Sequence, residues 1–139
     1  MSLLKIFSYH IEANDFTKAG RGSSDIKSNL KTIGIDAKTI RKIAIVSYEA
    51  EMNVVIHSIG GMLHCEIYDD KITITTEDDG PGIENVDLAM TEGFSTATES
   101  VRELGFGAGM GLPNMKRYSD DFSISSSPEG TMIKITILL

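Results

Sequence analysis

Two pairs of β-prone segments, each joined by a tight turn, constrain the fold of this 139-residue chain more than any other feature. The first pair is MLHCEIY and KITITTE, which flank Asp69-Asp70. The second pair is DFSISSS and TMIKITILL, which are joined by Pro128-Glu129-Gly130. Strands joined by tight turns pair antiparallel. With an opening strand over residues 3–12, the two hairpins predict a mixed, largely antiparallel sheet.

Helical segments precede and interrupt these strands. The sequence predicts a helix from Asp15 to about Ile33 that stops at Gly34, and a longer helix from Asp36 to about Ser58 that stops at Gly60-Gly61. It also predicts a short helical piece near Val86 to Met90. The last predicted helix extends from Met110 to Tyr118 and has Pro113 in its first turn. A glycine- and Ser/Thr-rich loop from Glu92 to about Ala108 has the length of a lid. This order predicts an α+β fold, a two-layer α/β sandwich with helices on one face of the sheet.

Composition narrows the class of protein. The length fits a single domain over residues 1–139. The formal net charge of -7 argues against nucleic acid as a direct partner, because a phosphate backbone requires a basic face. No apolar run is long enough to cross a bilayer, and the start of the chain does not have the pattern of a secretion signal. With Cys65 as the single cysteine, we expect a cytoplasmic protein that does not bind membranes.

The longer helix carries a polar stripe on an otherwise apolar surface. Apolar residues lie on nearly every side of it from Ile43 to Ile56, whereas Glu49, Asn53 and His57 recur every four residues. One interpretation makes Glu49 the base that deprotonates a nucleophile and Asn53 a ligand of Mg²⁺, a cation that prefers oxygen. The alternative is a polar helix edge with Glu49 paired to a lysine. His57 either contacts phosphate or lies in the last turn, where the helix dipole favours a cation.

A tight turn follows the KITITTE strand directly. It has the sequence Asp78-Asp79-Gly80-Pro81-Gly82-Ile83. Gly80 and Gly82 permit a flat ring to approach closely, and Asp78 can accept a hydrogen bond from an exocyclic amine such as that of adenine. The alternative is an ordinary turn, in which Asp, Gly and Pro are the expected residues.

A second glycine-rich segment leads into the predicted helix at residues 110–118. Its glycines are Gly105, Gly107, Gly109 and Gly111, which alternate with Phe106, Ala108 and Met110 before Leu112. Such a loop exposes successive N–H groups and directs a helix N-terminus toward an anion, whereas flexible linkers rarely contain Phe, Ala and Met in alternation. Upstream, the hydroxyls of Ser95 and Thr96 either reach phosphate or cap a turn. Thr131 either completes an adenine site or simply satisfies β preference.

In this order, Glu49-x-x-x-Asn53-x-x-x-His57, Asp78-x-Gly80-x-Gly82 and Gly107-x-Gly109-x-Gly111 resemble the motifs of the GHKL ATP-binding superfamily, which includes gyrase, histidine kinases and MutL. The resemblance covers essentially the whole chain. It points to the small bacterial branch of anti-sigma factors and switch serine/threonine kinases. The segments GFST and GMGLPNMKRYSDDF are particularly similar to the switch kinases that phosphorylate STAS-domain proteins in partner-switching systems.

The resemblance implies a Mg-ATP-dependent protein serine/threonine kinase. Glu49 would be its catalytic base, Asn53 its Mg²⁺ ligand, and residues 92–109 the ATP lid. The residues predicted to contact ATP are Asn53, His57, Asp78, Gly80, Gly82, Ile83, Ser95, Thr96, Gly105, Gly107, Gly109, Met110, Gly111, Leu112 and Thr131.

Several alternatives stay open from the sequence. The polar stripe is more similar to that of the anti-sigma branch, whereas the lid is more similar to that of the switch kinases. The partner is therefore either a sigma factor or a STAS-domain antagonist. Relatives often form dimers, so a homodimer stays an alternative to a monomer. A second function is an ATP-gated binding module that sequesters its partner without turnover. Histidine-kinase and gyrase-like functions are disfavoured, because we expect neither a preceding helix with a phosphoacceptor histidine nor a following transducer domain.

Overall fold

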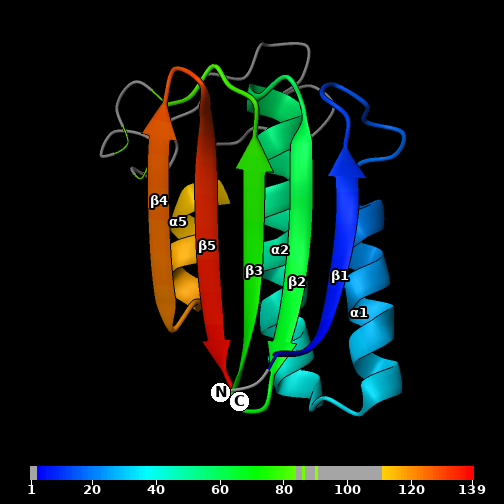
Figure 1. Cartoon of the computed structure of the whole chain (residues 1–139). Coiled ribbons are helices and arrows are strands. Elements are labelled where there is room, and N and C mark those ends of the chain that lie inside the picture. The colour runs from blue at the N-terminus through cyan, green and yellow to red at the C-terminus, as the bar shows by residue number, and fades with distance from the viewer. Residues whose placement is uncertain (1–2, 84–85, 87–89, 91–110) are drawn as a thin grey trace.

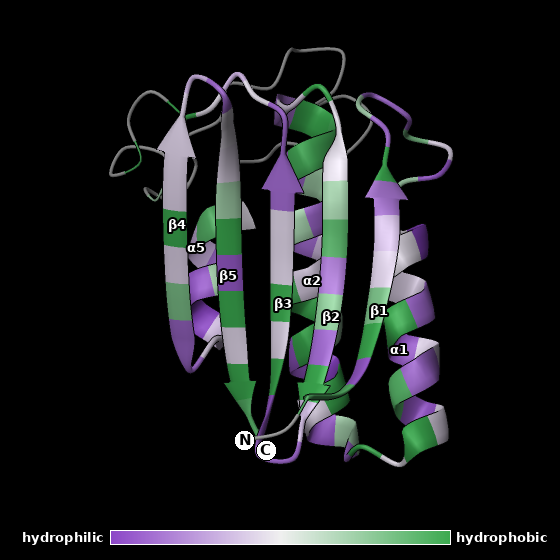
Figure 2. Ribbon diagram, in the orientation of Figure 1, coloured by the Kyte–Doolittle hydropathy of each residue, from purple (hydrophilic) through white to green (hydrophobic). Residues whose placement is uncertain are grey.

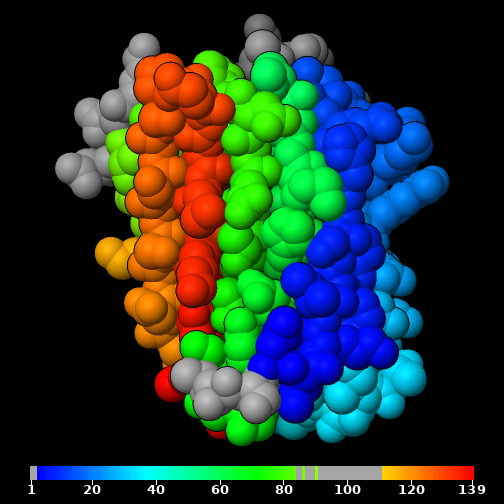
Figure 3. All heavy atoms as spheres, viewed as in Figure 1, coloured from blue at the N-terminus to red at the C-terminus, as the bar shows by residue number. Residues whose placement is uncertain are grey.

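The computed structural model describes residues 3–83, 86, 90 and 111–139. These residues form a five-stranded sheet with helices on one of its faces (Figure 1). The opposite face of the sheet is open in the space-filling view (Figure 3). The prediction of a two-layer α+β sandwich is therefore confirmed. The elements are β1 (Leu3–Ile11), α1 (Arg21–Ile33), α2 (Ala37–His57), β2 (Gly61–Tyr68), β3 (Lys71–Asp78), α5 (Gly111–Tyr118), β4 (Asp121–Ser127) and β5 (Gly130–Leu138).

The sheet has the strand order β1-β2-β3-β5-β4, and its strands pair antiparallel throughout. The parallel pair that a mixed sheet would contain does not occur among the described strands. Both predicted hairpins are present: Ile67 pairs with Ile72 across Asp69-Asp70, and Ser127 pairs with Gly130 across the second turn. Hydrophobic and hydrophilic residues alternate along β5 (Figure 2), as expected for a strand with one covered face.

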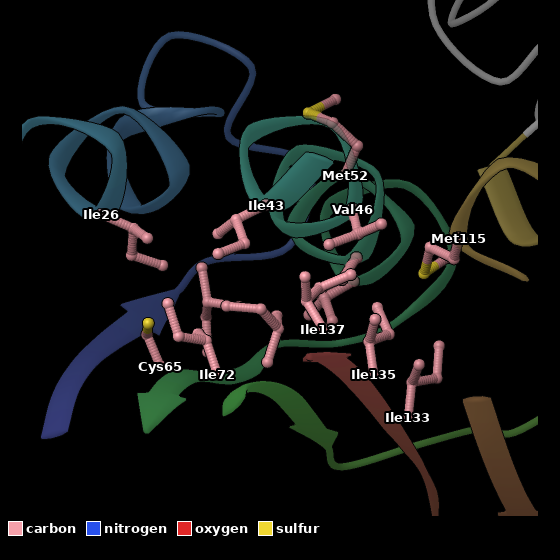
Figure 4. Packing of buried hydrophobic residues seen from close by; sticks show 14 of the residues in the cluster. Ile26, Ile43, Val46, Met52, Cys65, Ile72, Met115, Ile133, Ile135 and Ile137 are labelled. Atoms are coloured by element: carbon pink, nitrogen blue, oxygen red, sulfur yellow. The ribbon is translucent and has the colours of Figure 1, made fainter. Parts of the chain in front are cut away.

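The core lies between the sheet and α2. Ile43 and Val46 of α2 are fully buried and face a row of isoleucines on the central strands, whereas Met115 of α5 covers the β4 side (Figure 4). Side chains buried to this degree each stabilise the fold by about 1.5–3 kcal/mol relative to exposure. This packing fixes α2 across the sheet. The buried isoleucines of the sheet are Ile67, Ile72, Ile74, Ile133, Ile135 and Ile137.

The beginning of α2 agrees with the sequence analysis. Asp36 caps the helix, because its carboxylate accepts hydrogen bonds from the amides of Lys38 (3.0 Å) and Thr39 (3.2 Å). Gly34 ends the preceding helix in the left-handed conformation, with φ of 96°. The helix extends to His57, within one residue of the predicted end.

The predicted start of the first helix was wrong. Asp15 does not cap a helix; it accepts hydrogen bonds from the Thr17 hydroxyl (2.7 Å) and the Lys18 amide (3.2 Å) in a turn. The helix α1 begins only at Arg21, after Gly20 in the left-handed conformation, and its cap comes from elsewhere in the chain. Glu51 of α2 accepts hydrogen bonds from the amides of Gly20 (3.1 Å), Gly22 (3.3 Å) and Ser23 (2.9 Å). A cap supplied from another helix leaves no local pattern in the sequence.

Both described ends of the chain lie beside the β2–β3 turn. Leu3 pairs with Tyr68, and the amide of Leu139 donates to the carbonyl of Asp70 (3.0 Å). No helix among the described residues is long and apolar enough to span a membrane.

Candidate nucleotide site

Asp78 lies at the end of β3 and connects three parts of the chain. Its Oδ1 accepts hydrogen bonds from the amide of Gly80 in the following turn (3.0 Å) and from the amide of Thr131 at the start of β5 (3.0 Å). Both bonds go to the same oxygen, so the carboxylate is held in one orientation. Its second oxygen, Oδ2, takes part in neither bond. The hydrogen bond from an adenine amino group to Asp78 stays a prediction.

The glycines of this turn are required by backbone packing. Gly82 has a φ of 89°, and a Cβ at this position would lie 2.0 Å from the carbonyl oxygen of Ser127. Gly80 has a φ of 111° and faces the carbonyl of Pro128. The turn after β3 therefore lies directly on the β4–β5 turn, which fills the space beside both glycines. Their close approach to an adenine ring stays a prediction.

Gly82→Ala is expected to destabilise the fold by about 2–4 kcal/mol, because it combines an unfavourable left-handed backbone with overpacking. The matched control is Gly34→Ala, which has the same left-handed backbone but open space around the new methyl group. The control is expected to cost about 1 kcal/mol. Urea unfolding measures both variants, and equal losses would show that the contact with Ser127 does not contribute.

A pair of hydroxyl groups lies beside the Asp78 turn. Ser126 Oγ accepts a hydrogen bond from the Ile83 amide (2.7 Å) and shares another with Thr131 Oγ1 (2.8 Å). Thr131 and Ile83 were predicted site residues, and the structure brings both to the turn. Ser126 was missed by the sequence analysis. The alternation of side chains along β4 could have indicated it. Phe122, Ile124 and Ser126 face the helices, so Ser126 is a polar residue at an inward-facing position.

The helix α2, which carries the polar stripe, ends at the same end of the molecule as β3 (Figure 1). Glu49, Asn53 and His57 are all half-buried. The end of α2 is tied to the Asp78 turn, because Ser58 Oγ donates to the carbonyl of Gly80 (2.8 Å) and the Ile59 amide donates to the same oxygen (3.1 Å). The helix end and the turn after β3 are thus one connected structure.

Glu49 lies against the beginning of α5. Asn114 donates a hydrogen bond to its carboxylate, and Glu49 Oε2 would lie 3.2 Å from a Cβ placed on Gly111. Burial raises the pKa of Glu49, and the bond from Asn114 opposes this in part. A partly buried carboxylate with a raised pKa is suited to accept a proton. The alternative of an ion pair between Glu49 and a lysine is not seen among the described residues.

His57 has a different environment from the one expected of a cation in the last helical turn. Burial lowers the pKa of His57 and so favours the neutral imidazole. A neutral ring is a poor candidate for the helix-dipole role. The phosphate contact stays a prediction.

The glycine segment before α5 is largely outside the described residues. So are the predicted lid at residues 92–109 and most of the short helical piece, of which the Met90 amide donates to the carbonyl of Val86 (3.0 Å). At the segment's end, Gly111 begins α5 beside Glu49, whereas Leu112 is buried in the core. The predicted helix with Pro113 in its first turn is confirmed. The predicted site residues outside the described part are Ser95, Thr96, Gly105, Gly107, Gly109 and Met110.

The sequence that forms this fold and site matches a known class of protein. Residues 32–139 match the model of the histidine kinase-, DNA gyrase B-, and HSP90-like ATPases. The chain belongs to this family.

Within the family, the chain falls in the branch of the anti-sigma factors and RsbT-type kinases. It is 36% identical over 107 residues to the anti-sigma F factor of Caldanaerobacter subterraneus, covering 70% of this chain and 71% of the relative. It is 32% identical over 109 residues to the serine/threonine-protein kinase RsbT of Bacillus subtilis, covering 75% and 76%. The predicted superfamily and branch are confirmed.

Solved structures show the same fold. The RsbU and RsbW domains of a Mycobacterium tuberculosis protein match with a TM-score of 0.62 at 18% identity, covering 95% of this chain and 32% of that one. The SiaB-SiaC complex of Pseudomonas aeruginosa matches with a TM-score of 0.57 at 11% identity, covering 99% and 91%.

Proposed function

We propose that this chain is a Mg-ATP-dependent protein kinase of a bacterial partner-switching system, which phosphorylates a serine or threonine of a STAS-type partner in the cytoplasm. The observation that carries the proposal is Glu49, a half-buried carboxylate held by Asn114 at the N-terminus of α5. Similarity to RsbT, which is named a serine/threonine-protein kinase, supports the same activity.

The residues of the site suit a nucleotide. The adenine amino group is a hydrogen-bond donor, and Asp78 offers Oδ2 as an acceptor while Oδ1 is held by two amides. Asn53 would offer its amide oxygen to Mg²⁺, which keeps several waters and is bound largely through phosphates. No cluster of His, Cys, Asp or Glu among the described residues is able to hold a metal ion by itself.

The chemistry assigned to the protein is proton transfer and positioning. When bound, Mg-ATP supplies the γ-phosphoryl group. Glu49 accepts the proton of the partner's hydroxyl group. At the same time the hydroxyl oxygen bonds to the γ-phosphorus, and the bond between that phosphorus and the ADP oxygen breaks. Phosphoryl transfer relies mainly on positioning and charge neutralisation, so a small domain is sufficient.

A second function is supported by similarity to anti-sigma F factors. In this alternative the chain is an ATP-gated module that sequesters a sigma factor without turnover. The kinase is expected to form ADP when the purified partner is added, whereas the binding module is expected to form none. A coupled assay measures this ADP.

Calorimetry with Mg²⁺ tests the nucleotide site. Asp78→Asn is expected to weaken ATP binding about 100-fold, since losing a hydrogen bond to a charged group costs about 1.5–3 kcal/mol. The two backbone amides will take the Asn oxygen, so its NH₂ group will face the adenine NH₂ group. Asn53→Ala is expected to reduce the Mg²⁺ dependence of binding.

The control is Asp120→Asn. Asp120 Oδ2 also accepts from a backbone amide, that of Leu138 (2.7 Å), but Asp120 is exposed and its bond lies near the β2–β3 turn. This variant is expected to bind ATP like the wild type. If the wild-type protein binds no ATP, the proposed function fails.

A further inference from the structure

A short chain of hydrogen bonds joins the Asp78 turn to the β4–β5 hairpin and ends on a hydroxyl group. The Ile83 amide donates to Ser126 Oγ (2.7 Å), and Ser126 Oγ lies 2.8 Å from Thr131 Oγ1. Ser126 and Thr131 also lie opposite one another in the register of β4 and β5. The proton transfer assigned to Glu49 does not involve Ser126, so this residue has another role.

The hydrogens of this chain can be counted. Each hydroxyl group has one hydrogen to donate. The Ile83 amide supplies the hydrogen of the first bond, and one of the two hydroxyl groups supplies the hydrogen of the second. One hydroxyl hydrogen is therefore left over, whichever group donates within the pair. Among the described residues, no other hydrogen bond of Ser126 Oγ or Thr131 Oγ1 takes up this hydrogen.

The bond from Ile83 favours one direction for the chain. An oxygen that accepts a hydrogen bond becomes a better donor, because each bond in a chain polarises the next. Ser126, which accepts from the Ile83 amide, therefore donates to Thr131, and the hydrogen left over belongs to Thr131. This residue is only 5% exposed, so a hydrogen without an acceptor there is unfavourable. Thr131 thus has a donor to offer to a bound ligand.

Asp78 offers an acceptor beside this donor. The amides of Gly80 and Thr131 both donate to Oδ1 of Asp78, at 3.0 Å each, and Oδ2 takes part in neither bond. A carboxylate can only accept hydrogen bonds. The turn therefore combines an acceptor on Asp78 with a donor on Thr131. The complementary ligand has a donor beside an acceptor. Adenine has this order in its amino group and the neighbouring ring nitrogen, whereas hypoxanthine and guanine have a carbonyl oxygen beside an N–H group.

We propose that Ser126 is a positioning residue that sets the base selectivity of the nucleotide site. By donating to Thr131, Ser126 keeps the Thr131 hydrogen directed at the ligand, so that the site prefers a 6-amino purine to a 6-oxo purine. This role rests on the proposed function, because it requires the base of the nucleotide to lie at the Asp78 turn.

A purely structural role of Ser126 has a different consequence. If Ser126 only satisfies the Ile83 amide and holds the turn in place, its removal weakens the binding of every nucleotide equally. If Ser126 directs the Thr131 hydrogen, its removal weakens the binding of a 6-amino purine more than that of a 6-oxo purine. The ratio of two affinities therefore separates the two roles.

Calorimetry of the full chain with Mg²⁺ and either ATP or ITP measures this ratio. ITP has the ribose and phosphates of ATP but carries a carbonyl oxygen at position 6 and a hydrogen on N1. The wild type is expected to bind ATP at least about thirtyfold more tightly than ITP. Ser126→Ala is expected to weaken ATP binding about tenfold, the usual effect of one lost hydrogen bond, and ITP binding less than threefold. Equal losses for the two nucleotides, or an unchanged ATP affinity, would overturn the role of Ser126.

Two further variants serve as controls. Ser125→Ala removes the neighbouring hydroxyl of β4, which is exposed on the other face of the sheet, and is expected to bind both nucleotides like the wild type. Ser126→Thr keeps the hydroxyl group and is expected to retain the ratio of the wild type within threefold. A Ser126→Thr protein that loses selectivity to the same extent as Ser126→Ala would overturn the assignment to the hydroxyl group.

Hydrogen exchange of the Ile83 amide tests the chain of bonds without nucleotide. Exchange is expected to be at least tenfold faster in Ser126→Ala than in the wild type or Ser125→Ala, and equal rates would overturn the chain. A wild-type protein that binds neither ATP nor ITP would overturn the proposed function and the selectivity with it. A wild-type protein that binds ATP, together with equal losses for both nucleotides in Ser126→Ala, would overturn only the role of Ser126.

Discussion

Glu49→Gln is expected to lower the rate of phosphoryl transfer about 10²–10⁴-fold, the usual contribution of a general base. The glutamine keeps an oxygen that accepts the hydrogen bond from Asn114, so the start of α5 is expected to stay in place. ATP affinity is expected to change little. The measurement is transfer of labelled phosphate to a purified STAS-domain partner under single-turnover conditions.

The pH dependence gives this prediction a second readout. Burial raises the pKa of Glu49, so the wild-type rate is expected to rise with pH through that raised value, and the variant is expected to lack this rise. Stability changes in the opposite direction. A carboxyl with a raised folded-state pKa stabilises the fold most below its ordinary pKa, and this contribution is lost as pH rises through the raised value.

Thermal unfolding at pH 4 and pH 8 therefore provides a measurement without substrate. Glu49→Gln is expected to gain stability relative to the wild type at pH 8 but not at pH 4. Glu77→Gln, an exposed substitution of the same kind on β3, is expected to show no such difference. A Glu49→Gln protein that transfers phosphate at the native rate would exclude Glu49 as the base.

The largest loss of stability is expected from Glu51→Ala. Glu51 is 4% exposed, and its carboxylate accepts three backbone hydrogen bonds at the beginning of α1. Removing it leaves buried amides without an acceptor, at about 1–3 kcal/mol for each buried group. We expect a total loss of about 3–5 kcal/mol, a large part of the 5–15 kcal/mol that is typical of a folded domain.

Asp36→Ala is the matched control for this prediction. Asp36 also caps a helix, but it is exposed, so water can replace its carboxylate and the expected loss is about 1 kcal/mol. Glu51→Gln retains one acceptor oxygen and is expected to fall between the two. Urea midpoints compare the three variants, and a loss in Glu51→Ala no larger than in Asp36→Ala would contradict the assigned role.

The fold was predictable where local chemistry determines it. The two hairpin turns and the Asp36 cap are short-range features, and each predicted its element within a residue or two. The start of α1 was not predictable in this way, because Glu51 is 28 to 31 residues away from the amides that it caps. The sign of this cap in the sequence was a carboxylate on the side of α2 opposite to Glu49. Its role as a cap cannot be predicted without knowing how α1 packs against α2.

The sequence predicted which residue types form the site, but it predicted less well which contacts require them. Asp78 and Thr131 were expected near one another, and the structure joins them through one carboxylate oxygen. The glycines of the turn were read as space for a ring, whereas the structure shows that Gly82 makes room for the carbonyl of Ser127. Contacts between turns that are distant in sequence have no local signal, so Ser126 also remained hidden.

The position of the two chain ends affects how this fold can be combined with others. Leu3 and Leu139 lie beside the β2–β3 turn, at the opposite end of β3 from Asp78. An eight-residue strand is about 25 Å long, so a protein fused to either end would begin that far from the nucleotide site. The same fold matches 32% of the longer Mycobacterium tuberculosis chain. Reporter domains and affinity tags can thus be attached at either terminus without covering the Asp78 turn.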